Sequence, residues 1–197
     1  MRWDELERFL LDRATEDLLT DGDIRPCLAA FEDDDALLLA SLRSFAKGAY
    51  AQPVIEVLAL ALSLHANRVA LCVGGRAWSL DDPVPPVVAG VADLRQRVAA
   101  ITTVDGMAAD VIRAASIHPF DLRRDEVAWG PPIREAEQSW LGDALEAGVR
   151  HRHEFTADAD AARDQAVRCA ALGHALAFAP AVAARLDGVR SVNLRRC

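Results

Sequence analysis

The stretch that decides the fold runs from residue 52 to residue 80 and reads QPVIEVLALALSLHANRVALCVGGRAWSL. Pro53 suits the first turn of a helix, and residues 54–65 are apolar on nearly every side, which predicts a buried helix. The apolar run 68–73 ends at Gly74 and Gly75, which supply the positive φ angles of a two-residue turn. We therefore expect a hairpin beside this helix, with residues 76–80 as its second strand.

A helix that is apolar all round must be covered by other elements, and the predicted hairpin is the nearest sheet along the chain. We therefore expect the helix and the hairpin to share one core. Its predicted members are Val54, Ile55, Leu58, Leu62, Val69, Leu71 and Trp78.

The residues before this stretch predict a helix followed by another hairpin. Apolar residues recur every three or four positions from residue 3 to residue 19, with acids in the first turn, which is typical of an amphipathic helix. Residues 25–31 and 36–45 flank the acidic run 32–35, and this pattern favours two strands joined by a solvated turn. Residues 36–45 are also good helix formers with a glycine after them, so strand and helix both remain open there.

The residues after the deciding stretch predict a loop and further strands. Residues 81–86 hold three prolines within four positions, which excludes both a sheet ladder and a helix. Residues 97–104 and 111–117 are rich in β-branched residues and are separated by a short turn, and residues 125–129 predict a short edge strand. Such short connections indicate antiparallel pairing.

From residue 133 onward the pattern is helical. An apolar stripe predicts a helix over residues 140–148, and an Ala-rich helix is expected from about Asp158 to Phe178. A third, short helix or turn opens at Pro180 and stops at Asp187 and Gly188.

These elements predict an α+β fold, a mainly antiparallel sheet packed against helices, with a helical C-terminal third. We expect one globular domain over residues 1–197. Within it, the helical portion 133–197 packs on the mixed α/β portion 1–132.

Composition excludes several classes of protein. The chain carries 22 basic and 30 acidic residues, a formal net charge of −8, and an acidic balance opposes nucleic-acid binding. The longest apolar run, residues 54–64, contains Glu56 and is far shorter than the roughly 20 residues of a membrane span. Because the N-terminus lacks the apolar region of a secretory signal, we expect a cytoplasmic protein that binds neither nucleic acid nor membrane.

The recognised catalytic and metal-binding motifs are absent from the sequence. It contains no phosphate-binding G-x-x-x-x-G-K-[ST], no H-E-x-x-H and no G-x-S-x-G. The cysteines have no C-x-x-C spacing, which predicts free thiols rather than a zinc site or a disulfide framework. They are Cys27, Cys72, Cys169 and Cys197.

The cluster His151-Arg152-His153-Glu154 has metal-ligand chemistry. On an extended segment, His151 and His153 would face the same side and share a divalent cation, with Asp158, Asp160 or His174 completing the site. On a helix, residues two apart point about 200° from each other and cannot chelate. The other interpretation is that these imidazoles interact with the C-terminal dipole of the preceding helix.

Ser116 and His118 are expected to share one face of a strand, where they would form a nucleophilic dyad. The sequence places no acid near them to orient the histidine. A serine and a histidine at this spacing are otherwise ordinary strand residues.

A candidate interaction surface follows the buried helix. Alternation puts Arg76 and Trp78 on one strand face, and both residue types dominate interface hot spots. The rigid loop after them would present a preorganised surface through Pro83, Pro85 and Pro86. The alternative is that Trp78 is a core residue and the prolines only carry the chain across the sheet.

The sequence therefore predicts a non-catalytic protein-binding or self-associating module with no cofactor. The alternatives are a metal-dependent hydrolase that uses His151 and His153, or a small-molecule-binding regulatory domain. Small residues along the Ala-rich helix allow another helix to approach closely, which favours a homodimer. The competing possibility is that the helix that starts at Trp140 covers this small-residue face within one chain.

Overall fold

The computed structural model describes residues 2–46, 49–77, 95–107, 110–134, 140–155 and 158–186. The strands are β1 (Cys27–Glu32), β2 (Asp35–Ser41), β3 (Arg68–Ala77), β4 (Gln96–Asp105), β5 (Ile112–Arg123), β6 (Glu126–Trp129) and β7 (Ala175–Phe178). The helices are α1 (Trp3–Asp21), α2 (Ala51–Ser63), α3 (Trp140–Arg150), α4 (Ala159–Ala171) and α5 (Pro180–Arg185), with a short 3-10 helix η1 (Arg152–Glu154).

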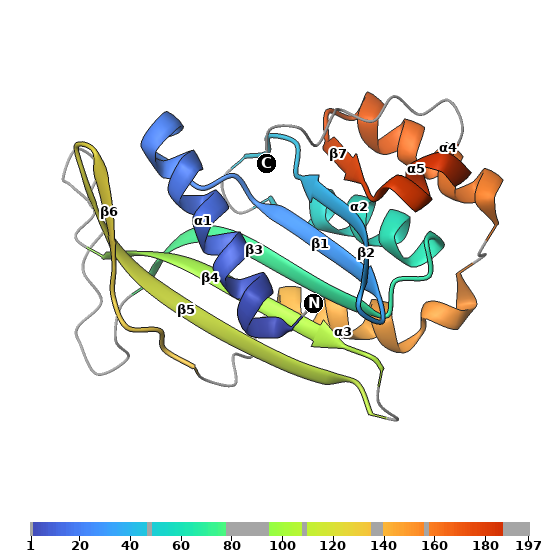
Figure 1. The fold of residues 1–197 in the computed structure, drawn as a ribbon, viewed down its shortest axis with the longest axis horizontal. Helices are drawn as coiled ribbons and strands as arrows, with labels where there is room; N and C mark the ends of the chain where they lie inside the picture. The colour runs from blue at the N-terminus through green and yellow to red at the C-terminus, as the bar shows by residue number, and fades with distance from the viewer. Residues whose placement is uncertain are drawn as a thin grey trace.

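The strands form one antiparallel sheet in the order β6-β5-β4-β3-β1-β2-β7. The α+β class and the antiparallel sheet are therefore confirmed. Helix α1 lies across one face of the sheet, and the remaining helices lie on the other side (Figure 1). In the part of the chain that the structure describes, no helix is both long and apolar enough to cross a membrane.

Strand β1 lies in the interior of the sheet and is buried on both faces. Leu28 and Ala30 belong to the core beneath α2, while Cys27, Ala29 and Phe31 belong to the core beneath α1. A strand that is covered on both sides needs apolar residues at every position, which explains its continuous apolar run. The sheet thus separates two cores, one on each face.

Helix α2 confirms the buried helix that the deciding stretch predicted. Its neighbours in the core include most of the expected residues, namely Val54, Leu58, Leu62, Val69 and Leu71. The prediction for Ile55 is wrong, because this side chain is 48% exposed. One residue turns a helix by about 100°, so Ile55 points to solvent while Val54 is buried in the core. Trp78 lies outside the described residues.

The β1–β2 hairpin is confirmed, with its turn in the acidic run. Residues 35–41 are a strand rather than a helix, because β1 pairs with one edge of β2 and β7 with the other. Asp33 adopts a φ of 54° in the turn. Arg68 stabilises this turn, since its Nη1 donates to the Asp33 carbonyl and to Asp34 Oδ1, both at 2.8 Å.

The predicted turn at Gly74 and Gly75 is wrong. Strand β3 runs straight through both glycines, which pair with Ala99 and Val98 of β4. A Cβ at Gly74 would lie 3.0 Å from the Cβ of Ile24. Gly74 therefore lacks a side chain because the segment that follows α1 packs closely against it, and not because the chain turns there.

The predicted Ala-rich helix ends earlier than expected. Helix α4 stops at Ala171, Gly173 adopts a φ of 98°, and residues 175–178 form strand β7. Pairing with β2 aligns Leu38 with Phe178 and overrides the helical propensity of this alanine-rich segment. The C-terminal part thus contributes an edge strand as well as helices. Helix α5 begins at Pro180 as predicted, and its expected stop at Asp187 lies outside the described residues.

The small-residue face of α4 is already occupied. Ala162, Ala166 and Cys169 are buried in the core that contains α2. Gln165 Nε2 donates to the Glu56 carbonyl of α2 at 3.1 Å, which fixes this contact. The packing of α2 against this face therefore removes the predicted reason for a dimer through α4.

Candidate functional site

Ser116 and His118 lie in a buried polar cluster between β5 and α1. Their side chains do share one strand face, with Ser116 Oγ 3.0 Å from His118 Nε2. Ser116 donates a hydrogen bond of 2.7 Å to Glu7 Oε1, which also lies 2.9 Å from His118 Nε2. Arg134 Nη2 donates to the other oxygen, Glu7 Oε2, at 2.8 Å. We call Glu7, Ser116, His118 and Arg134 the α1 cluster.

The α1 cluster differs from a nucleophilic triad in the direction of its hydrogen bonds. In a triad, the acid binds one ring nitrogen of the histidine and the serine binds the other. Here both Glu7 and Ser116 lie at Nε2, and the serine gives its proton to Glu7. The contacts join helix α1 to the sheet and direct the serine proton to Glu7 rather than to His118.

Electrostatics keep the Glu7 carboxylate ionised. Burial alone would raise the pKa of Glu7, but the hydrogen bonds from Ser116, Arg134 and His118 outweigh burial and lower it. Close by, Trp129 Nε1 donates to Thr15 Oγ1 of α1 at 3.1 Å. The Trp129 ring also meets His118 edge-on, with centroids 6.4 Å apart. Helix α1 is therefore held by a charged contact and an aromatic one.

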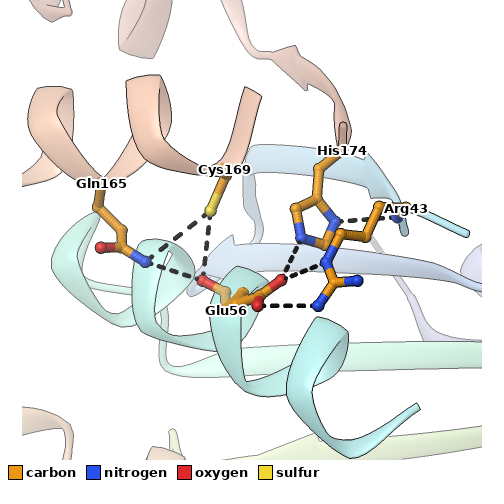
Figure 2. Close-up of polar contacts among 5 residues, drawn as sticks. All are labelled: Arg43, Glu56, Gln165, Cys169 and His174. Carbon is orange, nitrogen blue, oxygen red and sulfur yellow. Dashed lines mark hydrogen bonds and ion pairs between the residues drawn. The ribbon is translucent and has the colours of Figure 1, made fainter. Parts of the chain in front are cut away.

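A second polar cluster, shown in Figure 2, is half-buried and centres on Glu56 of α2. Arg43 binds its carboxylate through two hydrogen bonds, from Nε at 2.9 Å and from Nη2 at 3.1 Å. His174 Nε2 lies 2.8 Å from Glu56 Oε2, while His174 Nδ1 faces the Arg43 backbone N–H at 3.1 Å. Because Nδ1 accepts that hydrogen bond, the proton of the neutral ring lies on Nε2 and is donated to Glu56. We call Arg43, Glu56, Gln165, Cys169 and His174 the α2 cluster.

The bidentate arginine dominates the charge of the α2 cluster. Hydrogen bonds from Arg43 and then His174 outweigh burial and lower the pKa of Glu56 to about 2. The Cys169 thiol donates to the Glu56 carbonyl at 3.4 Å, and burial raises its pKa to about 11. A thiol that stays protonated is a poor nucleophile, so Cys169 acts as a small packing residue.

The residues predicted to hold a metal lie near each other but not on an extended segment. His151 follows α3, and its Nδ1 lies 3.0 Å from Glu154 Oε1. His153 belongs to η1, with its ring centroid 6.3 Å from that of His151. Asp158 instead caps α4, accepting the N–H of Asp160 at 3.2 Å. Within the described ranges, no three His, Cys, Asp or Glu residues gather to hold a metal, and a metal here stays a prediction.

The predicted tryptophan and proline surface lies mostly outside the described residues. Arg76 is exposed near the end of β3, and its Nη1 donates to the Arg95 carbonyl at 2.9 Å. The other members of that surface fall in the segment that the structure does not describe, namely Trp78, Pro83, Pro85 and Pro86.

A feature that the sequence analysis missed is the outer edge of β5. This strand has 12 residues, but β6 pairs only with Phe120–Arg123, and Ile117 forms an isolated bridge with Ile133. Among the described residues, no strand pairs with residues 112–116 on this side. We call residues 112–116 the β5 edge. The indication of this edge in the sequence was that the predicted strand at residues 111–117 is longer than the one at residues 125–129.

Exposed apolar side chains come from the same part of the fold. Ile112, at the start of the β5 edge, is 59% exposed, and Ile133, whose backbone bridges Ile117, is 46% exposed. Met107, in the connection that precedes β5, is 50% exposed. Exposed apolar groups beside strand backbone that no described strand pairs with are typical of a surface that pairs with another chain.

A small hollow lies between the end of α2 and the start of α4. It encloses about 150 Å³ and includes Ser63, His65, Asp158 and Arg185 in its lining. Pockets for small organic ligands usually measure about 300–1,000 Å³, so this hollow is smaller than such a pocket.

Comparison of the chain with models of known protein families, with curated proteins and with solved structures finds no match.

Proposed function

We propose that the protein is a non-catalytic interaction module that self-associates through the β5 edge. The observation that carries this proposal is the row of backbone groups at residues 112–116, which no described strand pairs with. A strand whose outward N–H and C=O groups meet no described strand is a template for another strand, and many proteins bind partners in this way.

The β5 edge lacks the usual features that prevent strand pairing. Natural edge strands are often protected by proline, a bulge or a free charge. Residues 112–116 contain no proline, and their one charge, Arg113, is directed to Asp143 and Glu146 of α3. Every residue from 112 to 116 keeps its backbone N–H donor, and the charge of Arg113 is compensated. Neither feature therefore opposes pairing with another strand.

A second copy of the chain is the partner that the charges favour. Ile117 sends its N–H and C=O outward to Ile133, so alternation directs those of Arg113 and Ala115 outward as well. A two-fold axis at Ala114 would then place Arg113 opposite Ala115 of the partner subunit. No like charges would face each other, and this symmetry is the commonest among soluble oligomers.

The polar clusters support a non-catalytic role. In the α1 cluster, the serine proton is directed to Glu7, and in the α2 cluster both nitrogens of His174 are engaged. These side chains stabilise contacts between elements of the fold, and their polar atoms bind each other rather than an open cavity.

Sedimentation equilibrium over about 1–100 μM tests the proposal. The chain has a mass of 21.3 kDa, and we expect this value to double as the concentration rises. Ala115→Pro should return the mass to that of the monomer, because it removes an outward N–H that the β4 ladder does not use. The native Pro119, also an outward position of β5, indicates that the strand tolerates proline there.

Val167→Lys serves as the matched control, since this exposed residue lies on α4, away from the β5 edge. It should leave the association unchanged. A monomer mass at every concentration would overturn self-association, and a dimer that persists in a folded Ala115→Pro variant would overturn the choice of edge. Circular dichroism confirms that each variant is folded.

A further inference from the structure

Cys27 and Cys72 lie directly opposite each other on neighbouring antiparallel strands, β1 and β3. Both are buried in the core beneath α1 and both are free thiols. Opposing residues of an antiparallel pair have Cα atoms about 4.5–5.5 Å apart. A disulfide needs a Cα separation of about 4.4–6.8 Å, so this pair can be joined without moving the strands apart.

The two thiols differ in their readiness to ionise. A hydrogen bond from Cys72, together with the nearby positive charge of Arg13, lowers the pKa of Cys27 despite its burial. The same hydrogen bond and burial raise the pKa of Cys72. Of the two sulfur atoms, Cys27 is therefore the one that ionises more readily.

We propose that Cys27 and Cys72 form a redox-active dithiol, which a low-molecular-weight disulfide such as oxidised glutathione converts to a cross-strand disulfide. The Cys27 thiolate attacks one sulfur of the reagent, whose S–S bond breaks and whose leaving thiolate takes up a proton. Cys72 then loses its proton and attacks the Cys27 sulfur, which releases the second reagent thiol. Two electrons pass from the cysteine pair to the reagent, and two thiols leave.

Access to the pair depends on the segment that joins α1 to β1. Cys27 is the first residue of β1 and follows this segment, and Cys72 lies two residues before the exposed Gly74. Asp17 of α1 accepts the backbone N–H of Arg25 at 3.1 Å and holds the segment closed. A reagent thus reaches the sulfur atoms when this connection opens locally, and the rate of oxidation reports on that opening.

In the decisive experiment, the folded chain is treated with oxidised glutathione and the reaction is quenched with acid. The remaining thiols are then alkylated in denaturant, and the tryptic peptides are mapped without reductant. Trypsin places Cys27 in residues 14–43 and Cys72 in residues 69–76, because the Arg25-Pro26 bond resists cleavage. We expect these two peptides to be linked, with a mass about 2 Da below their sum, from the loss of two hydrogens. A map without this linked peptide, or with glutathione adducts alone, would overturn the proposal.

Single variants test whether both sulfur atoms are needed for the linked peptide. Cys169→Ala is the matched control and should form the linked peptide at the normal rate, since Cys169 is a lone buried thiol elsewhere in the fold. Cys72→Ala and Cys27→Ala should each lose the linked peptide and retain only a glutathione adduct on the remaining cysteine, because each variant lacks one of the two sulfur atoms of the bond. A linked peptide that joins the remaining cysteine to another cysteine of the chain would overturn the assigned pair, and circular dichroism checks that each variant remains folded.

Discussion

Two half-buried glutamates, Glu7 and Glu56, have partners of the same kinds and yet differ in which parts of the fold they join. Each accepts hydrogen bonds from an arginine and a histidine. Glu56 receives two hydrogen bonds from an arginine whose side chain is 26% exposed, whereas Glu7 receives one from an arginine that is 64% exposed. Similar residues therefore produce a firm junction in one place and a weaker one in the other.

The physical reason for this difference is geometric. A bidentate guanidinium fixes both carboxylate oxygens and orders fewer mobile side chains for each hydrogen bond that it forms. The α2 cluster also joins four parts of the chain, since Arg43 follows β2, Glu56 lies on α2, Cys169 on α4 and His174 before β7. The α1 cluster joins one helix to the sheet. We expect α1 to be the first part of the described fold to open.

The largest expected effect is from the apolar packing of α2, where Leu58 lies against Gly148 of α3. Leu58→Ala removes a side chain that is buried in the same core as the helix pair α2 and α4. The variant should lose about 2–5 kcal/mol of unfolding free energy, because the cavity collapses only in part. Urea denaturation measures this loss, and an unchanged midpoint would contradict the placement of Leu58.

Glu56→Gln should have the next largest effect. It removes the charge that Arg43 and His174 bind, and we expect a loss of about 2 kcal/mol at pH 7. Glu7→Gln should cost about 1 kcal/mol under the same conditions, since its arginine is largely in solvent. Equal losses in the two variants would contradict the difference between the clusters.

Lowering the pH should remove the difference in unfolding free energy between the wild type and Glu56→Gln. The folded-state pKa of Glu56 is about 2, below its ordinary value of 4.5. A lowered pKa stabilises the fold above about pH 4.5, and this contribution is lost as the pH falls toward 2. The wild type and Glu56→Gln should therefore converge in stability across that window, as chemical denaturation at each pH will show. A constant difference would contradict the assigned charge.

The smallest expected effect on global stability is from Glu7→Gln, but this variant should lower the local stability of α1 relative to α2 and α4. Residues of α1 should exchange their amide hydrogens faster in this variant, while those of α2 and α4 keep the wild-type rate. Hydrogen exchange followed by mass spectrometry resolves the two regions. Uniform acceleration across all helices would show that α1 does not open separately from the rest.

Local patterns along the chain were enough to predict much of the fold. The helical spacing of α1, the apolar run of α2 and the acidic turn between β1 and β2 each depend on neighbouring residues, and each was predicted. Glu56 was visible as one charge within an apolar helix, which is a signal for a buried ion pair. Its partners, 13 and 118 residues away, were not visible from that pattern.

Two of the errors have a common cause in contacts between distant residues. Gly74 and Gly75 have the composition of a turn, but Ile24 and strand β4 hold them in an extended conformation. The segment of β7 has helical composition, but pairing with β2 makes it a strand. In both places, tertiary packing outweighed a local preference of about 1 kcal/mol or less.

Local patterns in the chain were sufficient to predict the α+β class, the antiparallel pairing and the solvated acidic turn, because periodicity and turn residues act over a few positions. Three features became visible only in the folded chain: Glu7 meets Ser116 across 109 residues, Cys27 faces Cys72, and the β5 edge has no described partner strand. These juxtapositions depend on strand order and register. Both are set by burial of the whole chain, which no local pattern encodes.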